Sequence, residues 1–206
     1  MRSATVVLAA ALTAAINAAP RAIEQSATAV NAAPIVLVSA RVALDGTSNI
    51  HAFTASTTAV RVAKIEIGGT PEGDLFDHLL QPGGLKTFDV VIAAASLSSP
   101  KDGIDKNMHK ALEVQESPEI RFRLRALEAA GEAYRATGWL TIAGVEREIT
   151  LHLQVERKGS TLGVTGDTAL LMTDFGVTPP KAMLGMLRTN PKVRIRLELV
   201  FGASLT

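Results

Sequence analysis

The stretch "EIRFRLRA", residues 119–126, alternates apolar and charged side chains along the chain. Ile120, Phe122 and Leu124 are apolar, and an arginine follows each of them. Because successive side chains of a β-strand point to opposite faces of the sheet, this pattern predicts a strand with one apolar face and one face in water. Antiparallel sheets commonly have two such faces, so the stretch favours an antiparallel all-β fold.

The same alternation recurs in "KVRIRLEL", residues 192–199, and in "EREITLHLQVER", residues 146–157. Turn signals such as Asp45-Gly46 and Gly83-Gly84 separate further segments of strand character. These further strands are predicted over residues 35–44, 49–55, 58–67, 86–95, 133–142 and 162–172. Many short strands with few helices predict an antiparallel barrel of about eight strands, or a sandwich.

Two segments have helical character. In "GIDKNMHKALE", residues 103–113, the apolar residues Ile104, Met108 and Leu112 fall on one face of a helix. The segment "KAMLGMLR", residues 181–188, predicts a second, short helical turn. The expected fold is therefore all-β with one or two short helices.

The N-terminal residues resemble a secretory signal. Arg2 is followed by uncharged, mostly apolar and alanine-rich residues as far as Pro20, a segment too short in its apolar part for a membrane span. Cleavage is expected after Ala18 or Ala19, or after Ala29, and an uncleaved N-terminal anchor is the alternative. We therefore expect residues 1–29 to be a signal peptide with a flexible N-terminus, residues 30–206 to be the folded domain, and the protein to be periplasmic or secreted.

Composition excludes several classes of function. The net charge is +1, so no strong field attracts nucleic acid or an anionic membrane. The chain has no cysteine, which excludes disulfides, thiolate catalysis and cysteine-based metal sites.

No catalytic or metal-binding motif is present. None of the four histidines has the spacing of a metal-ligand pair, and solvated side chains are the simpler interpretation of them. No nucleophile-elbow, nucleotide-binding or dinucleotide-binding motif occurs. One enzymatic alternative stays open, in which His51 works with a carboxylate such as Asp45 or Asp174. We therefore expect that the protein is not an enzyme and that it has no catalytic residue, no bound metal and no cofactor.

The apolar faces of the predicted strands define a candidate interior. Trp139 is predicted to lie on the opposite face of its strand and so outside this interior. Its inward positions include Phe88, Val90, Ile92, Phe122, Leu124, Leu140, Ile142, Leu170 and Met172. Many other inward positions are alanine, glycine or threonine, and aromatic residues make up only 4% of the chain. An eight-stranded barrel is just wide enough to be filled by side chains or to hold one small ligand, and the pattern leaves both open.

Five motifs in order resemble the YceI-like family, from Asp45 to Phe201. They are "DGTSNIHAF" (45–53), "GIDKNMHKAL" (103–112), "ESPEIRFRL" (116–124), "ATGWLTIAGVEREITLHLQV" (136–155) and "MTDFGVTPPKAMLGMLRTNPKVRIRLELVF" (172–201). The chain departs from the family pattern at Ala52, where an acidic or polar residue often follows the histidine. The resemblance implies an exported, lipocalin-like barrel that encloses a polyisoprenoid or quinone-like chain and has no catalytic set.

On this resemblance, the expected partner is an apolar lipid, for carriage or storage. The expected ligand contacts are Phe53, Phe88, Met108, Phe122, Leu170, Met172, Phe175, Met183 and Met186. Methionine side chains adapt to irregular apolar space, so the methionine-rich connection over 172–187 and the helix carrying Met108 are expected to line or cap the entrance. One alternative stays open: a solid barrel that binds a partner through its outer face. The sequence also leaves open whether the chain forms a homodimer through edge strands.

Overall fold

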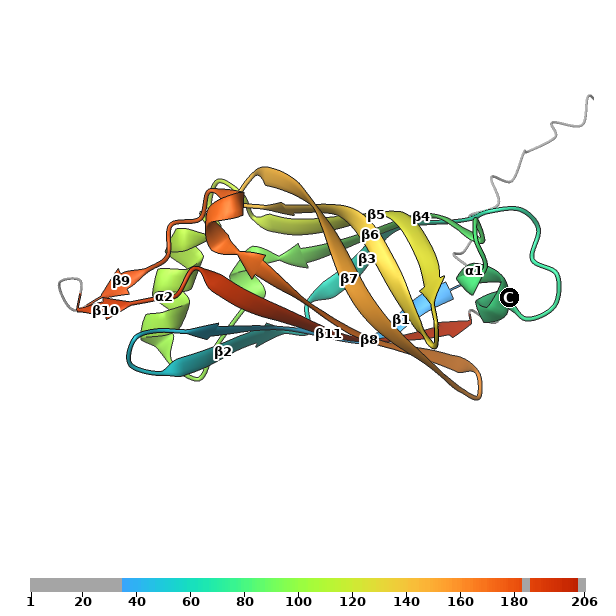
Figure 1. Ribbon diagram of the computed structural model, residues 1–206, viewed down its shortest axis with the longest axis horizontal. Coiled ribbons are helices and arrows are strands. Elements are labelled where there is room, and N and C mark those ends of the chain that lie inside the picture. The colour runs from blue at the N-terminus through green and yellow to red at the C-terminus, as the bar shows by residue number, and fades with distance from the viewer. Residues whose placement is uncertain (1–34, 183–185, 204–206) are drawn as a thin grey trace, which may run out of the picture. The chain divides into compact units, whose positions relative to one another are not determined.

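The structure is a computed structural model that describes residues 35–182 and 186–203. The expected signal peptide and Met183 lie outside the described residues. Within the described residues, nine antiparallel strands form one sheet (Figure 1). They are β1 (Ile35–Thr47), β2 (Ala52–Thr57), β3 (Val60–Ile67), β4 (Leu85–Ala93), β5 (Glu119–Ala130), β6 (Ala133–Ile142), β7 (Val145–Lys158), β8 (Thr161–Leu171) and β11 (Lys192–Ala203).

The sheet curls on itself. Its order is β2-β1-β11-β8-β7-β6-β5-β4-β3, so the two edge strands, β2 and β3, are separated in the chain only by Thr58 and Ala59. β1 and β3 approach within 8 Å between Cα atoms, although no ladder of hydrogen bonds joins them in the described part of the chain. The result is an incompletely closed, lipocalin-like barrel. The strand pattern predicted a barrel or a sandwich, and the resemblance to the YceI-like family implied the lipocalin-like barrel that the structure shows.

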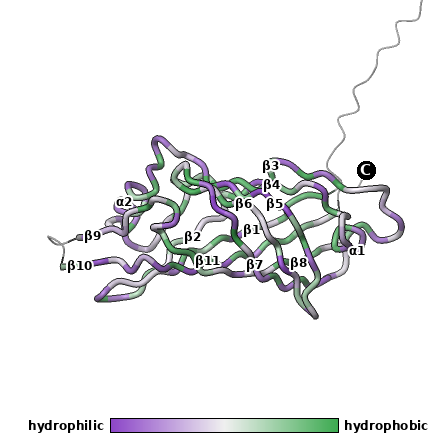
Figure 2. The backbone as a smooth tube through the Cα atoms, turned by 45° about the horizontal axis from the view of Figure 1, so that its top comes forward, coloured by the Kyte–Doolittle hydropathy of each residue, from purple (hydrophilic) through white to green (hydrophobic). Residues whose placement is uncertain are grey.

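The alternation in β5 separates the inside of the barrel from the outside. The arginines of β5 point outward, where Arg123 binds Glu146 at 2.6 Å and Arg125 binds Glu148, both glutamates coming from β7. Trp139 of β6 lies in register between Arg123 and Glu148 and is 38% exposed, which confirms that it faces away from the interior. Figure 2 shows polar and apolar residues alternating along the strands.

Short helices lie at the ends of the barrel. α2 (Asp102–Ala111) matches the predicted helix, and Met108 is its buried residue. The helix α1 (Leu75–Leu80) was not predicted, nor were the single 3₁₀ turns η1 (Ala94–Ser96) and η2 (Met172–Phe175). Figure 1 places α1 at one end of the curled sheet and α2 at the other.

The predicted helical turn over 181–188 is wrong at both of its described ends. β9 (Lys181–Ala182) and β10 (Leu187–Arg188) pair as a small antiparallel ribbon. The side chain of Asn49 donates to the carbonyl of Met186 and accepts from the N–H of Arg188, each at 2.8 Å. These contacts hold the backbone extended, so a tertiary interaction overrides the local helical pattern.

The interior divides into two apolar clusters. The α1-end cluster consists of the buried residues Ile35, Phe76, Leu79, Leu162, Leu199 and Phe201. The α2-end cluster consists of the buried residues Ala55, Leu97, Met108, Leu112, Leu140, Leu170, Phe175, Val177 and Val193. Each helix therefore contributes its apolar side to the cluster at its own end.

Some small inward residues make room for large neighbours. A Cβ atom placed on Gly138 would lie 2.6 Å from Cζ of Phe122 and would also overlap the carbonyl oxygen of Arg123. A Cβ atom on Gly166 would lie 2.5 Å from a methyl carbon of Leu153. At these two positions, the neighbouring side chain occupies the space that a larger residue would take, so the glycine does not create a cavity.

We expect Gly138→Ala to lower the free energy of unfolding by about 1–3 kcal/mol, because the new methyl group overpacks against Phe122 and strand β5. Urea denaturation followed by circular dichroism measures this loss. Gly163→Ala on β8 is the matched control, since its Cβ would meet only the carbonyl oxygen of Glu156 at an ordinary 3.5 Å. Equal stability of the two variants would contradict the packing argument.

Candidate ligand-binding site

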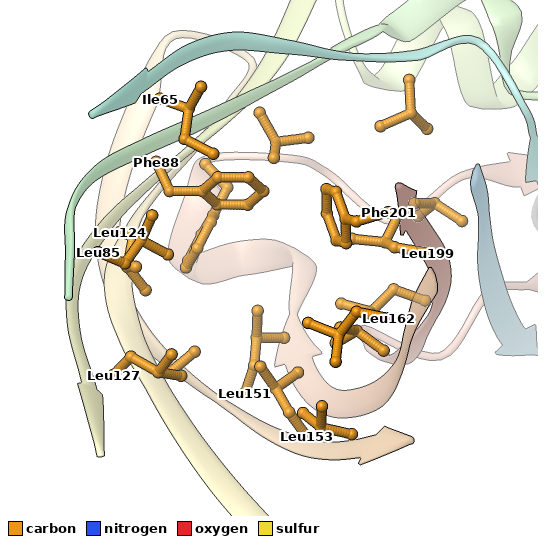
Figure 3. Close-up of a pocket in the computed structure, with 18 of the residues that line it drawn as sticks. Ile65, Leu85, Phe88, Leu124, Leu127, Leu151, Leu153, Leu162, Leu199 and Phe201 are labelled. Atoms are coloured by element: carbon orange, nitrogen blue, oxygen red, sulfur yellow. The ribbon is translucent and has the colours of Figure 1, made fainter. Parts of the chain in front are cut away.

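Two apolar cavities occupy the interior of the barrel. The inner cavity has a volume of about 190 Å³ and is lined by the inward residues of the sheet and by α1. All of its lining residues except Thr168 are apolar. Figure 3 shows Phe88 and Phe201 pointing into it from opposite walls, with Leu124, Leu151 and Leu162 around them.

The outer cavity is larger, at about 500 Å³, and lies against α2, η2 and the β9–β10 ribbon. Its apolar lining includes Phe53, Met108, Met172, Phe175 and Val177. Unlike the inner cavity, it also has polar lining residues: Ser48, His51, Lys101, Asn107, Lys181 and Thr189. This cavity therefore combines an apolar interior with hydrogen-bond donors.

The two cavities adjoin. Leu170 of β8 and Ile195 of β11 line both of them. The inner cavity reaches α1, and the outer cavity reaches α2, so together they follow the barrel from one end to the other. Such a shape suits a long apolar molecule better than a compact one.

Seven of the nine predicted contact residues line these cavities. Phe88 and Phe122 line the inner cavity, Leu170 lines both, and Phe53, Met108, Met172 and Phe175 line the outer cavity. Met186 is 67% exposed and lines neither cavity, while Met183 lies outside the described residues. Contact of any of these residues with a ligand stays a prediction.

One end of the inner cavity is formed by α1, whose residues were not predicted to line it. Phe76 and Leu79 are 2% and 6% exposed, and both line the cavity. The available signal was short: Asp74 stands before an apolar pair spaced by three residues, as an N-cap stands before a helix. A helix of six residues has too few turns for its periodicity to be evident.

A set of contacts centred on Asp74 fixes α1 to the barrel. The Asp74 carboxylate accepts from the N–H groups of Phe76 and Asp77 at 2.9 and 3.2 Å, which caps the helix. It also binds the guanidinium of Arg157 through two hydrogen bonds of 2.6 and 2.7 Å. Arg157 lies near the end of β7, and its guanidinium carbon stands 4.6 Å from the centre of the Phe76 ring, in a cation–π geometry. We call these three residues, Asp74, Phe76 and Arg157, the α1 clamp.

The described residues do not assemble the site that the enzymatic alternative requires, in which His51 would bind Asp45 or Asp174. The Asp45 carboxylate binds Arg196 at 2.6 and 2.9 Å and accepts from Thr54 at 2.7 Å, whereas His51 lines the outer cavity. Hydrogen bonding from Arg196 holds the pKa of Asp45 below its usual range, so this carboxylate is ionised and engaged. Asp174 belongs to η2, and no hydrogen bond joins it to His51 among the described residues.

Two histidines, His78 and His109, are partly buried and hydrogen-bond to the backbone as well as facing solvent. The Nε2 atoms of His78 and His109 lie 2.7 Å from the backbone carbonyl oxygens of Gly68 and Leu97, respectively. Within residues 35–182 and 186–203, no three His, Asp or Glu side chains come together in a group that could hold a metal ion. Over the same residues, no helix has the length and apolar character needed to cross a membrane.

Comparison with known proteins identifies relatives of this arrangement. The model of the YceI-like domain matches residues 38–201. No curated protein sequence matches the chain.

Solved structures with the same fold include BcnA from Burkholderia cenocepacia, with 18% identity, a TM-score of 0.64, and coverage of 78% of this chain and 95% of that one. A polyisoprenoid binding domain from Saccharophagus degradans, implicated in plant cell wall breakdown, has 15% identity, a TM-score of 0.62, and coverage of 83% and 99%. The YCEI protein of Campylobacter jejuni has 17% identity, a TM-score of 0.53, and coverage of 71% and 85%.

The α1 clamp predicts a specific pH dependence of stability. The hydrogen bonds from Arg157, with those from the backbone of Asp77 and Phe76, hold the pKa of Asp74 well below its ordinary value of 3.8. A carboxyl group whose pKa is lower in the folded state stabilises the fold above its unfolded pKa, and this contribution disappears as the pH falls through the folded pKa. We expect wild type to be more stable than Asp74→Asn at pH 7, and the difference to shrink below about pH 4.

Urea denaturation of both proteins at several pH values measures this difference. Asparagine keeps the helix cap but not the charge, and the other carboxyl groups titrate in both proteins. A difference that is the same at pH 7 and at pH 3 would show that the charge of Asp74 contributes nothing.

Proposed function

Because this chain belongs to the YceI-like domain family, we propose that it binds a polyisoprenoid or an isoprenoid quinone inside its barrel and carries or stores that lipid. The hydrocarbon chain would occupy the inner cavity and continue past Leu170 and Ile195 into the outer cavity. The proposed role requires no reaction and no further cofactor.

The observation that carries this proposal is the wall of the inner cavity, which runs from α1 to the outer cavity and is apolar except at Thr168. Each methylene group removed from water contributes roughly 0.8 kcal/mol. A few buried isoprene units therefore offset the cost of association and reach roughly micromolar affinity. Among the described residues, no buried side-chain nitrogen or oxygen lacks a hydrogen-bond partner, so nothing in the wall demands a polar ligand.

The polar residues of the outer cavity suit a ligand with one polar end. Lys101 and Asn107 belong to α2 or its N-terminal boundary, and His51 comes from the β1–β2 connection. Their amine, amide and imidazole groups can donate to a carbonyl or hydroxyl oxygen. A quinone ring or a prenyl alcohol head group would meet these donors while its tail extends toward α1.

One structural relative supports the same class of ligand. The Saccharophagus degradans domain is described as polyisoprenoid binding, and it shares the fold over 83% of this chain. At 15% identity, that likeness concerns the fold, and the cavity residues of this chain provide the rest of the argument.

We also propose that the protein works outside the cytoplasm. The basis is the alanine-rich N-terminal sequence with a single early arginine, which resembles a signal peptide. Fractionation of the host cells, followed by N-terminal sequencing of the mature protein, tests this part separately. Intact protein in the cytoplasmic fraction would contradict it.

Native mass spectrometry of protein purified from its own host, followed by organic extraction, tests lipid binding directly. We expect an adduct that is released as an isoprenoid lipid. Protein without an adduct that also fails to take up added farnesol or geranylgeraniol would contradict the proposal and favour a barrel that acts through its outer face.

A pair of neighbouring substitutions tests where the lipid binds. Leu170 is buried at the junction of the cavities, whereas Leu171, the next residue on β8, is 43% exposed. We expect Leu170→Phe to weaken the binding of geranylgeraniol by about tenfold or more, because the ring occupies the passage. Leu171→Phe is the matched control and should bind like wild type in the same titration. Equal affinities of the two variants would place the lipid elsewhere.

A further inference from the structure

We propose that α1 is the fixed end of the lipid-binding space, and that Phe76 and Leu79 set the longest hydrocarbon chain that can be buried. This inference rests on the proposed function, since it assigns a length limit to the same site. It identifies two specificity-determining residues that lie far from the polar residues of the outer cavity.

The positions of Phe76 and Leu79 make them the end wall. Both side chains are almost fully buried, and both line the inner cavity. α1 lies at the end of the barrel opposite α2, and α2 borders the outer cavity (Figure 1). A chain that enters past α2 and follows the apolar wall therefore ends against these two side chains.

The α1 clamp makes this wall resistant to displacement. Arg157 holds Asp74 through two hydrogen bonds and stacks over the ring of Phe76, so it connects the N-terminus of α1 to β7. The guanidinium Nε also donates to the carbonyl oxygen of Gly159 at 2.8 Å, which fixes its own orientation. Moving Phe76 away from the cavity would break these contacts together.

The connections on both sides of α1 are also closely packed. The imidazole of His78 bonds to the carbonyl oxygen of Gly68, and the N–H of Gly68 donates to the carbonyl oxygen of Gly84 at 2.9 Å. Any side chain at Gly84 would overlap the carbonyl group of His78, and any side chain at Gly68 would overlap that of Gly83. The backbone here has little room to yield to a longer ligand.

The opposite end has a different character. The outer cavity is bordered by polar side chains, including Lys101 and Asn107, and by the two-residue strands β9 and β10. A ligand longer than the apolar space must leave its surplus at this polar end, in contact with water. Extra isoprene units beyond the limit then add no buried surface and no affinity.

Chain-length titrations test the limit. The probe is N-phenyl-1-naphthylamine, whose fluorescence reports displacement by geraniol, farnesol, geranylgeraniol and solanesol, and in parallel by straight-chain alcohols of increasing length. We expect the affinity of wild type to rise with chain length up to a break and then to level off. Phe76→Ala removes about as many carbon atoms as one isoprene unit contains. We therefore expect it to move the break to a longer chain and to improve the binding of the first overlong alcohol by about tenfold relative to the last fitting one.

Two further variants keep the test decisive. Val164→Phe adds a ring to the wall of the inner cavity beside the α1-end cluster and should move the break to a shorter chain, even if Phe76→Ala fails to fold. Phe53→Ala is the matched control, because it makes the same deletion in the outer cavity. It should alter affinity without moving the break.

The possible failures are distinguishable. A break that stays at the same length in every folded variant would overturn the inference and leave lipid binding intact. Binding of straight-chain alcohols alone, with a break that Phe76→Ala or Val164→Phe moves, would uphold the length limit and overturn the polyisoprenoid assignment. Binding of neither series would overturn both.

Discussion

The main constraint on this structure is that one sheet must bury its own apolar face. No second sheet and no layer of helices packs on that face within the described residues, so the sheet must curl until its inward side chains face one another. Curling leaves two open ends, which side chains of the strands alone do not close. α1 and α2 cover these two ends, and each buries its apolar side in the cluster at its own end. The cavities thus arise from the same constraint as the fold.

The outer face of the sheet supports this arrangement without providing much of its stability. Arg123, Arg125, Arg194 and Arg196 each pair with a carboxylate on another strand, and the partner side chains remain substantially exposed. Exposed ion pairs of this kind contribute little net free energy. Their larger effect is on register, because a shift by one residue would turn these charges into the apolar interior. The charged positions therefore help to define which face encloses the cavities.

Most of the strands could be predicted from the sequence because the period-two pattern is local. The alternation within "EIRFRLRA" and "KVRIRLEL" is enough to identify their inward residues. The spacing of apolar residues over 103–113 identifies the buried face of the helix in the same way. The misses share a different cause. β10 is extended because Asn49, far away in the chain, binds the backbone of Met186 and Arg188, and β9 pairs with β10. In the same way, α1 is held by Arg157 of β7. Such contacts leave no periodic trace in a segment of two to six residues.

The candidate site was predictable in part for the same reason. Inward parity identified Phe88, Phe122 and Leu170, but parity cannot reveal how much space lies between facing walls. Gly138 and Gly166 illustrate the difficulty: both are inward gaps in the sequence, yet Phe122 and Leu153 occupy those gaps in the structure. The empty volume that remains depends on how nine strands curl, which no single strand encodes.

The chemistry of the inner wall limits what kind of selectivity this protein can have. A site built to hydrogen-bond its ligand rejects an analogue that lacks the bonding group, because a buried polar group is then left without a partner. The inner cavity offers almost no polar group with which to do this, since Thr168 is the only residue of its lining, within the described part of the chain, that is not apolar. An apolar pocket discriminates between chains by only about 1–3 kcal/mol for each methylene. Under the proposed function, selectivity among lipids would come from two places: the proposed fixed end at α1, which would limit chain length, and the donors around the outer cavity, which would bind the polar end. Because these two elements are separated by the length of the barrel, an apolar wall without hydrogen-bonding groups could still favour one class of ligand.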